Sequence, residues 1–405
     1  MTPETKASAV EPMDAGGAAD AGDGMRLELA PRQRIARDEF RAFAAAAIAP
    51  HADRWDREEA IPEGLPKELA ARGYLGSLLP AEHGGAGLDM ITYGLLTEEI
   101  GRACSSVRSL LTVHDMVAHA IRRWGSREQR ERWLPALARG EVLGALALSE
   151  ENAGSDAKGV ETTAIEEPEP AGSGFVLDGH KKWTTFGQLA GLFLVFAQCG
   201  GKPAAFLVER GTPGLAVTPI RGMLGTRASM LAGLTFERCR VPRSHLLGRV
   251  GFGVSHVAAA ALEQGRYSVA WGSVGIAQAC LDACLAYAAA HRQFGVPIGE
   301  HQLVRAMLSD MVTGVRAGRL LCCRAGYLRQ SGDPGAIAET MVAKYFCGRL
   351  AARSAADAVQ IHGANGCSAD FPVARYFRDA KIMEIIEGSN QIQQISIARF
   401  DFQEL

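Results

Sequence analysis

The sequence lacks the features that would direct it to a membrane or to a nucleic acid. No apolar run approaches the roughly 20 residues of a membrane-spanning helix, and the longest, around 42–49, is mostly alanine. The 43 Lys and Arg residues against 45 Asp and Glu residues give a net charge of −2. This balance offers no basic surface for nucleic acid or anionic lipid. The first 24 residues hold five acidic side chains and one lysine, unlike a secretory signal or a transit peptide.

The cysteines exclude a disulfide framework and a zinc site. Their number is odd, nine, in a chain long enough to fold without covalent cross-links. Cys322 and Cys323 are adjacent, and Cys280 and Cys284 lie one helical turn apart, which are not zinc-ligand spacings. We therefore expect reduced thiols that serve as small core residues, a cytoplasmic location and no metal.

Residue patterning divides the 405-residue chain, which is 47% apolar, into a tail and three units of an α+β multidomain fold. Residues 1–24 are mostly small or acidic and predict a disordered tail. Helical periodicity over 31–138 predicts an N-terminal α-helical domain, residues 25–140. Short apolar runs punctuated by Gly, Pro, Asp and Asn predict a middle β-domain, residues 141–250, that is barrel-like.

The last unit, residues 251–405, has the pattern of a C-terminal four-helix bundle. Long Ala-rich helices are predicted over 255–291, 302–330, 336–361 and 376–400. No G-x-G-x-x-G motif follows a strand, which argues against a dinucleotide-binding Rossmann fold.

Two strand-like segments carry polar groups that suit a flat ring. Leu146–Asp156 runs from a strand into a loop where Gly154 allows close backbone approach. In Lys181–Thr185, alternation puts Trp183 and Thr185 on one face, suited to stacking and hydrogen bonding with a heteroaromatic ring. The alternatives are a simple strand-to-turn transition for the first segment and a core tryptophan for the second.

Glu387 is the candidate base. It ends an apolar helical stretch, and Gly388 and Ser389 then break and restart the chain. A carboxylate in apolar surroundings has a raised pKa and can accept a proton near neutrality. The alternatives are a solvated Glu at a helix end, and Ser389 acting as a helix N-cap.

Together these segments resemble one known family. Five motifs occur in an order that is specific for this family. They are S-E-x-x-A-G-S-D from 149, K-W-x-T from 182, R-x-F-G-x-P-I from 292, Q-I-x-G-x-x-G from 360 and D-A-K-I-x-x-I-x-E-G-S from 379. From about Arg32 to Arg399 the chain resembles the acyl-CoA dehydrogenase flavoproteins. The resemblance implies FAD in a cleft between the β-domain, the C-terminal helices and a neighbouring subunit, and hence a homodimer or homotetramer.

The resemblance also assigns expected roles to individual residues. Those matching family positions around FAD are Leu146, Leu148, Ser149, Gly154, Ser155, Trp183, Thr185, Arg292, Gln293, Phe294, Gln302, Gln360, Ile361, Gly363, Ala364, Ser389 and Gln391. Those expected near the acyl thioester are Ser155, Glu263, Arg266 and Gly388.

In the chemistry that the resemblance implies, Glu387 removes the α-proton of the thioester while flavin N5 takes the β-hydride. The backbone N–H of Glu387 and the flavin ribityl 2′-hydroxyl hydrogen-bond the thioester carbonyl oxygen. One branch of the family carries its base immediately before Arg266, but that position here is Gly265, which favours Glu387.

The chain departs from the family pattern at several positions. His291 holds the place of a usual Arg, so that either His291 or the following Arg292 pairs with the FAD diphosphate. Glu263 stands where Asp is usual, Glu151-Asn152 replaces Pro-Gly, Ala364 replaces Gly, and Cys367 replaces an aromatic residue.

Residues 104–111, 268–272 and 383–389 look like those of dehydrogenases from polyketide and nonribosomal-peptide clusters, which include the enzymes that make hydroxy- or methoxymalonyl carrier-protein extender units. We therefore expect a (hydroxy)acyl group on an acyl carrier protein as substrate. The alternatives are short-chain acyl-CoA oxidation in catabolism, a flavin oxidase, and an inactive acyl-binding member. The expected electron acceptor is an electron-transfer flavoprotein or oxygen.

Overall fold

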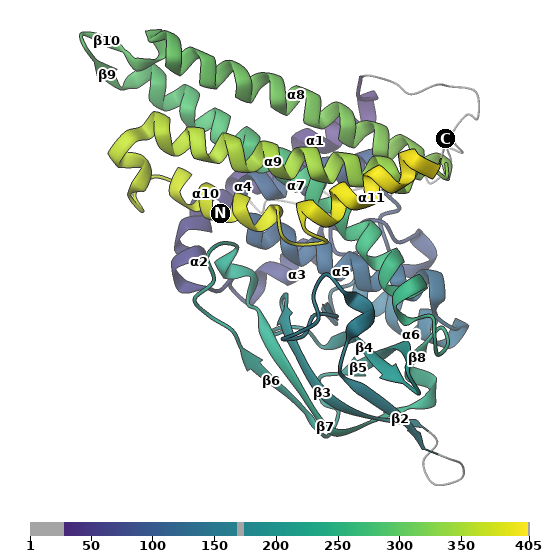
Figure 1. Ribbon diagram of the computed structural model, residues 1–405. Coiled ribbons are helices and arrows are strands. Elements are labelled where there is room, and N and C mark those ends of the chain that lie inside the picture. The colour runs from purple at the N-terminus through teal and green to yellow at the C-terminus, as the bar shows by residue number, and fades with distance from the viewer. Residues whose placement is uncertain (1–27, 168–173, 404–405) are drawn as a thin grey trace, which may run out of the picture.

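The computed structural model describes residues 28–167 and 174–403, so the expected tail over 1–24 lies outside the described residues. Helices at both ends of the chain pack together above a β-sheet formed by the middle of the chain (Figure 1). The α+β architecture predicted from the patterning is confirmed.

Two of the N-terminal helices, α4 and α6, begin at capping side chains. Asp89 accepts hydrogen bonds from the backbone N–H groups of Ile91 and Thr92, and Ser126 forms a capping box with Gln129. These helices are α1 (Pro31–Phe43), α2 (Ala52–Glu58), α3 (Gly64–Ala71), α4 (Met90–Ala103), α5 (Ser105–Trp124) and α6 (Arg127–Ala138).

The middle of the chain forms an eight-stranded mixed sheet of order β6-β7-β3-β2-β4-β5-β8, with β1 parallel to β4. Strand β4 is buried along nearly its whole length, as its apolar run predicts. The strands are β1 (Gly144–Ala147), β2 (Thr163–Glu167), β3 (Gly174–Thr184), β4 (Leu192–Cys199), β5 (Lys202–Glu209), β6 (Leu215–Pro219), β7 (Ala232–Pro242) and β8 (Leu246–Leu247).

The C-terminal helices pack on α4 and α5 as well as on one another. They are α7 (Ala259–Ala290), α8 (Gln302–Ser331), α9 (Ala336–His362), α10 (Val373–Met383) and α11 (Asn390–Gln403), and the hairpin of β9 (Arg292–Gln293) and β10 (Val296–Pro297) joins α7 to α8. The helix expected over 376–400 is two helices, α10 and α11, and the turn between them includes Gly388 and Ser389, where the sequence predicts a break.

Two features of the core bear on the sequence predictions. The segment Gly253–Ala290 is long and apolar enough to span a membrane, but 72% of its most apolar window is buried against other elements, as in a core helix. All the cysteines are unpaired, and all but Cys323 and Cys367 are buried, which confirms the use of most of them as small core residues.

Candidate active site

Glu387 lies in the turn between α10 and α11, four residues beyond the end of α10. It adopts a left-handed backbone conformation, with φ of 55°, and Gly388 follows with φ of 88°. Ser389 accepts a hydrogen bond from Ile392 N at 3.4 Å, so it caps α11, which confirms that alternative. The expectation that Glu387 ends a helix is therefore wrong: the turn, and not a helix terminus, sets its direction.

Three long side chains from other helices hold the carbonyl groups of this turn. Arg266 Nε on α7 donates to the carbonyl of Glu387 at 3.1 Å, and Lys344 Nζ on α9 donates to the carbonyl of Gly388 at 2.8 Å. Gln393 Nε2 on α11 donates to both carbonyls at 3.1 Å. These contacts fix the backbone of a strained turn, which orients the carboxylate.

The Glu387 carboxylate packs against a helix that has no side chain at the point of contact. A Cβ atom at Gly265 would lie 2.6 Å from Glu387 Oε2 and 2.8 Å from Met116 Sδ. Oε2 is shielded from solvent and has no hydrogen-bond partner among the described residues. The alternative of a solvated glutamate is therefore wrong for this oxygen, although Glu387 as a whole residue is partly exposed.

Burial raises the pKa of Glu387 to about 7, and the nearby cations Arg266, Arg108 and Lys344 oppose that rise. Burial also lowers the pKa of Lys344 to about 8. A carboxylate with a pKa near neutrality can both accept and release a proton at physiological pH.

A buried ion pair joins the loop after β1 to strand β3. Lys181 Nζ contacts Glu150 Oε1 at 2.5 Å and donates to the Leu148 carbonyl at 3.2 Å. Lys182 N donates to the Ser149 carbonyl at 2.9 Å. Leu148 is buried and Ser149 partly exposed, as is Leu146 on β1. The two segments singled out in the sequence thus lie side by side.

Trp183 lies at an irregularity near the end of β3. The register with β7 shifts between Lys181 and Thr184, Trp183 has φ of 62°, and its side chain is 44% exposed. The alternative of a core tryptophan is therefore wrong. The simple alternation expected for Trp183 and Thr185 also stops here, since the strand ends at Thr184.

These groups fit a flat heteroaromatic cofactor. The ring of Trp183 offers an exposed face, and the buried Thr184 Oγ1 has no partner among the described residues. A Cβ built on Gly154 meets nothing within 4 Å, and Gly154 and Ser155 are exposed. A ring system can therefore approach this loop closely.

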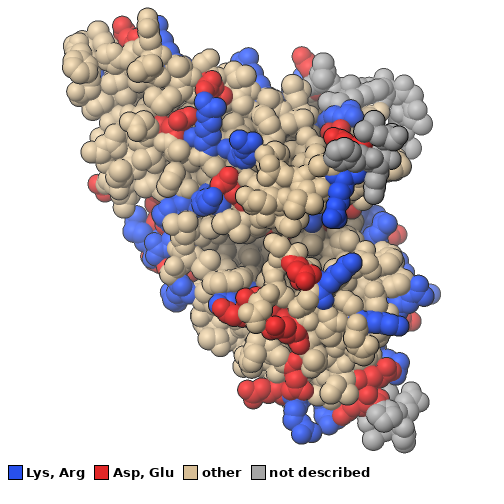
Figure 2. All heavy atoms as spheres, in the orientation of Figure 1, with Lys and Arg blue, Asp and Glu red and all other residues tan. Residues whose placement is uncertain are grey.

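The turn between α10 and α11 lies on the side of the helices that is toward the sheet (Figure 1). Arg378 on α10 donates to the Leu224 carbonyl at 3.1 Å, and Thr226 N donates to Asp379 Oδ1 at 2.6 Å. The molecular surface is hollowed where the C-terminal helices meet the sheet (Figure 2). Helix α10, which precedes the candidate base, is thus fixed to the loop between β6 and β7 of the sheet domain.

A second group of expected cofactor residues lies far from Glu387 in the fold, at the tip of the bundle (Figure 1). Phe294, in the β9–β10 hairpin, is 94% exposed, and Arg292 and Gln293 are also exposed. His291 stacks on Tyr287 with ring centroids 4.8 Å apart. Of the two candidates for the diphosphate, Arg292 is therefore the more accessible.

The remaining expected residues lie at helix ends or on α7. Gln302 begins α8, and Gln391 is exposed in the first turn of α11. The end of α9 holds exposed Gln360, buried Ile361, and Gly363 with φ of 59°, followed by exposed Ala364. On α7, Glu263 pairs with Arg329 at 2.7 Å, next to the Arg266 contact described above.

The three segments of the chain match the three domain models of one family. Residues 30–141, 145–239 and 253–400 match the N-terminal, middle and C-terminal domains of acyl-CoA dehydrogenase. The chain belongs to the acyl-CoA dehydrogenase family. Members of this family are FAD-dependent oxidoreductases that act on CH–CH groups.

Whole-chain relatives support the same assignment. The probable acyl-CoA dehydrogenase YngJ of Bacillus subtilis is 38% identical over 93% of this chain and 99% of its own. The structure of butyryl-CoA dehydrogenase from Megasphaera elsdenii superposes with a TM-score of 0.89 at 31% identity, covering 93% of this chain and all of that one. FkbI, described as serving biosynthesis of a methoxymalonyl extender unit of a polyketide, superposes with a TM-score of 0.82 at 34% identity, covering 91% and 99%.

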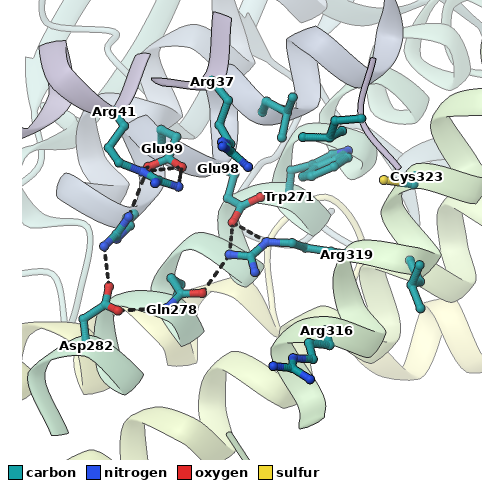
Figure 3. Close-up of a pocket in the computed structure, with 14 residues that line it drawn as sticks. Arg37, Arg41, Glu98, Glu99, Trp271, Gln278, Asp282, Arg316, Arg319 and Cys323 are labelled. Carbon is teal, nitrogen blue, oxygen red and sulfur yellow. Dashed lines mark hydrogen bonds and ion pairs between the residues drawn. The ribbon is translucent and has the colours of Figure 1, made fainter. Parts of the chain in front are cut away.

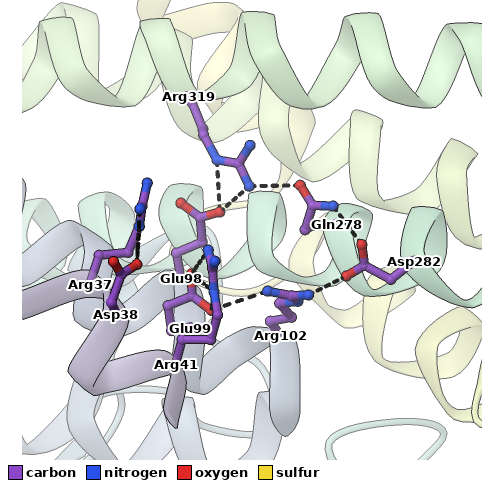
Figure 4. A network of polar contacts seen from close by, with 9 residues as sticks. All are labelled: Arg37, Asp38, Arg41, Glu98, Glu99, Arg102, Gln278, Asp282 and Arg319. Atoms are coloured by element: carbon purple, nitrogen blue, oxygen red, sulfur yellow. Dashed lines mark hydrogen bonds and ion pairs between the residues drawn. The ribbon is translucent and has the colours of Figure 1, made fainter. Parts of the chain in front are cut away.

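The molecule also has a charged cavity away from the acyl-CoA dehydrogenase site residues. It measures about 530 Å³, is lined by residues of α1, α4, α7 and α8, and includes none of the expected site residues (Figure 3). Arg319 pairs with the buried Glu98, and Arg102 bridges Glu99 and Asp282 (Figure 4). This network joins the N-terminal helices to the C-terminal ones.

The sequence does not reveal three charged side chains that lie near the candidate site. They are Arg108, Lys344 and Lys181, the last of which pairs with Glu150. Lys344 and Arg108 lie in long helices, where an isolated cation is usually solvated. In the structure each is buried at a helix–helix contact. One signal was available for Lys181: it precedes Lys182 in a strand whose alternation would turn one of the two lysines inward.

Proposed function

We propose that this protein dehydrogenates a short acyl thioester, with Glu387 as the base that removes the α-proton. The observation that carries the proposal is the Glu387 Oε2 atom, which is buried, unpartnered and packed on Gly265. FAD, when bound, accepts the β-hydride. The bond between Cα and its hydrogen breaks, the proton passes to Oε2, and a carbon–carbon double bond forms in the acyl chain.

The turn itself would stabilise the charge that develops on the thioester oxygen. The backbone N–H of Glu387 donates to no acceptor among the described residues, whereas the neighbouring carbonyls of Glu387 and Gly388 are held by Arg266, Lys344 and Gln393. A fixed N–H group aimed at a developing oxyanion contributes strongly to catalysis. The closed surroundings also exclude water from the carboxylate.

In this proposal FAD lies against the loop after β1 and Trp183, and Ser389 and Gln391 contact its linker. The exposed hairpin residues Arg292 and Phe294 reach the FAD of a second subunit, so that the enzyme works as a homo-oligomer. The 94% exposure of Phe294 supports this role, because a large apolar side chain so exposed is typical of an interface.

We propose an acyl carrier protein, rather than coenzyme A, as the carrier of the acyl group, in cytoplasmic secondary metabolism. The similarity to FkbI supports this proposal. The competing candidate is short-chain acyl-CoA oxidation, which the similarity to butyryl-CoA dehydrogenase favours.

The test uses the purified flavin-loaded enzyme under anaerobic conditions. Identical acyl groups are offered on coenzyme A and on an acyl carrier protein, and bleaching of the flavin absorbance is followed by rapid mixing. Faster bleaching with the carrier protein supports the proposal, and equal or faster bleaching with free CoA esters refutes the carrier preference. Peroxide release in air without another acceptor would assign an oxidase instead of an enzyme that reduces an electron-transfer flavoprotein.

A further inference from the structure

The charged cavity between α1, α4, α7 and α8 has more arginines than carboxylates in its lining (Figure 3). Its volume of about 530 Å³ suits a small molecule. The carboxylates are those of Glu98, Glu99 and Asp282. The arginines are Arg37, Arg41, Arg102, Arg316 and Arg319. Five guanidinium groups against three carboxylates leave the lining with an excess of two positive charges.

Each carboxylate of the lining already has an arginine partner (Figure 4). The ion pairs are Arg319–Glu98 at 2.5 Å, Arg41–Glu99 at 2.7 Å and Arg102–Asp282 at 2.6 Å. Gln278 links two of these pairs, because it accepts from Arg319 at 2.8 Å and donates to Asp282 at 2.9 Å. This network holds the N-terminal helices against the C-terminal ones, so three of the five arginines have a structural role.

Arg37 and Arg316 are the two arginines that this network leaves out. Arg316, on α8, is exposed and has no hydrogen-bond or ion-pair partner among the described residues. Arg37, on α1, contacts Asp38 at 2.9 Å, but the Asp38 side chain is 60% exposed and does not line the cavity. Figure 3 shows Arg37 and Arg316 on opposite sides of the cavity, with Arg319 between them. Each of these two sides thus has a guanidinium that can bind an oxyanion.

Apolar side chains form another part of the lining. They include Leu95, Leu320, Trp271 and Cys323. Leu320 is 47% exposed, and covering such apolar surface is favourable. In Figure 3, Trp271 and Cys323 lie to one side of the arginines. A ligand that fills this cavity therefore has an apolar part as well as charged groups, which an inorganic ion lacks.

We propose that this cavity binds a small organic dianion, in which an apolar chain separates two anionic groups, either carboxylates or phosphates. One anionic group pairs with Arg37 and the other with Arg316, while the chain lies along the apolar part of the lining. The lining contains none of the residues expected at the acyl-CoA dehydrogenase site, so the inference is independent of the proposed function. A ligand that bridges α1 and α8 also stabilises the folded state, in which these helices lie together.

Ordinary solvated side chains at Arg37 and Arg316 would behave differently. An exposed ion pair contributes little to affinity, so separate solvated arginines would not distinguish a dianion from a monoanion. In a site that bridges the two arginines, the second anionic group binds intramolecularly once the first is in place, and the affinity rises. Comparing a dianion with a monoanion of the same chain length therefore separates the two roles.

The experiment titrates the flavin-loaded enzyme with suberate, octanoate, octanediamine and octanediol bisphosphate, and calorimetry measures each Kd. At least one of the two dianions should bind about tenfold or more tightly than octanoate, because it adds a second charge-assisted pair. Octanediamine, the matched dication, should not bind. Tighter binding of the bisphosphate indicates a ligand with phosphate groups, and tighter binding of suberate indicates a dicarboxylate.

The variants Arg37→Leu and Arg316→Leu should each remove the preference for the dianion over octanoate. Neither arginine joins two helices, so both variants are expected to fold. Arg324→Leu is the matched control, since Arg324 is also exposed on α8 but pairs with Glu339 and does not line the cavity.

Thiol labelling tests the position of the ligand. The dianion should slow maleimide labelling of Cys323, which lines the cavity, and leave that of the exposed Cys367 unchanged. Burial raises the pKa of Cys323 to about 11, so labelling is measured at alkaline pH. Failure of both dianions to bind at millimolar concentration, equal binding of octanoate, an unchanged preference in either Arg37→Leu or Arg316→Leu, or unprotected Cys323 overturns the inference.

Discussion

The substitution Glu387→Gln should lower the activity of this enzyme without lowering its stability. Gln keeps the shape of the side chain but cannot take the α-proton, so kcat/KM should fall by about 100- to 10,000-fold. Flavin content should stay unchanged, because the Glu387 carboxylate packs against Gly265 on α7, which is not among the segments proposed to bind FAD.

The same substitution should stabilise the fold at alkaline pH. Burial raises the pKa of Glu387 from 4.5 to about 7, so the folded state disfavours the ionised form. At pH 8 that difference costs about 3 kcal/mol, at 1.36 kcal/mol for each pH unit. Stability from protonated Glu387 is fully present below pH 4.5 and is lost as the pH rises through 7. Gln does not titrate, so the variant should have the higher Tm at pH 8 and an equal Tm near pH 4.5.

The assay combines steady-state kinetics with thermal unfolding over pH 5 to 9. In the wild type, kcat/KM of the free enzyme should rise about tenfold per pH unit up to pH 7 and then level off. Glu384→Gln is the matched control, since Glu384 lies in the same turn and accepts from Lys381 and Asn390. Near-normal turnover of Glu387→Gln, or equal loss in both variants, would refute the assignment of the base.

Three further substitutions test the neighbouring parts of the site. Lys181→Met should destabilise the protein by about 3–5 kcal/mol and weaken flavin retention, because it leaves Glu150 buried without its cation. Chemical denaturation measures the loss of stability, and flavin titration measures the loss of retention. Adding Glu150→Gln to this variant should restore part of both. Gly265→Ala should lower kcat with little loss of flavin, because the new methyl group would lie 2.6 Å from Glu387 Oε2; an unchanged kcat would contradict the packing described. Phe294→Ala should weaken subunit assembly and flavin binding without lowering monomer stability. Sedimentation measures the assembly, and flavin release measures the binding. An intact, flavin-saturated oligomer of this variant would contradict the interface role of Phe294.

The sequence predicts the elements whose side chains repeat regularly and misses those defined by tertiary contacts. Strand β4 follows directly from its continuous apolar run, and helix α5 from its apolar periodicity. Strand β2 does not follow from the sequence, because its residues are largely polar and its pairing with β3 makes it a strand. The break between α10 and α11 carries the Gly388 signal, but apolar residues on both sides disguise it as one helix.

The residues of the candidate site also fall into those that the sequence predicts and those that it does not. Glu387 and Trp183 stand out in sequence by their neighbours, and the structure gives each the exposure that its role needs. Arg108 does not stand out, because a cation in a Ser-rich helix resembles a solvated residue. Its side chain is buried against Gly272 of α7, where a Cβ atom would lie 2.7 Å from Arg108 Cδ, and this is a property of packing between distant segments.

The most direct test of the account is the isotope effect at the α-carbon in anaerobic flavin bleaching. We expect the flavin of the wild-type enzyme to bleach more slowly with an α-deuterated acyl thioester than with the protiated one, and the flavin of Glu387→Gln to bleach with neither at a comparable rate. Equal rates for both thioesters, together with wild-type bleaching by Glu387→Gln, would show that Glu387 does not remove the α-proton.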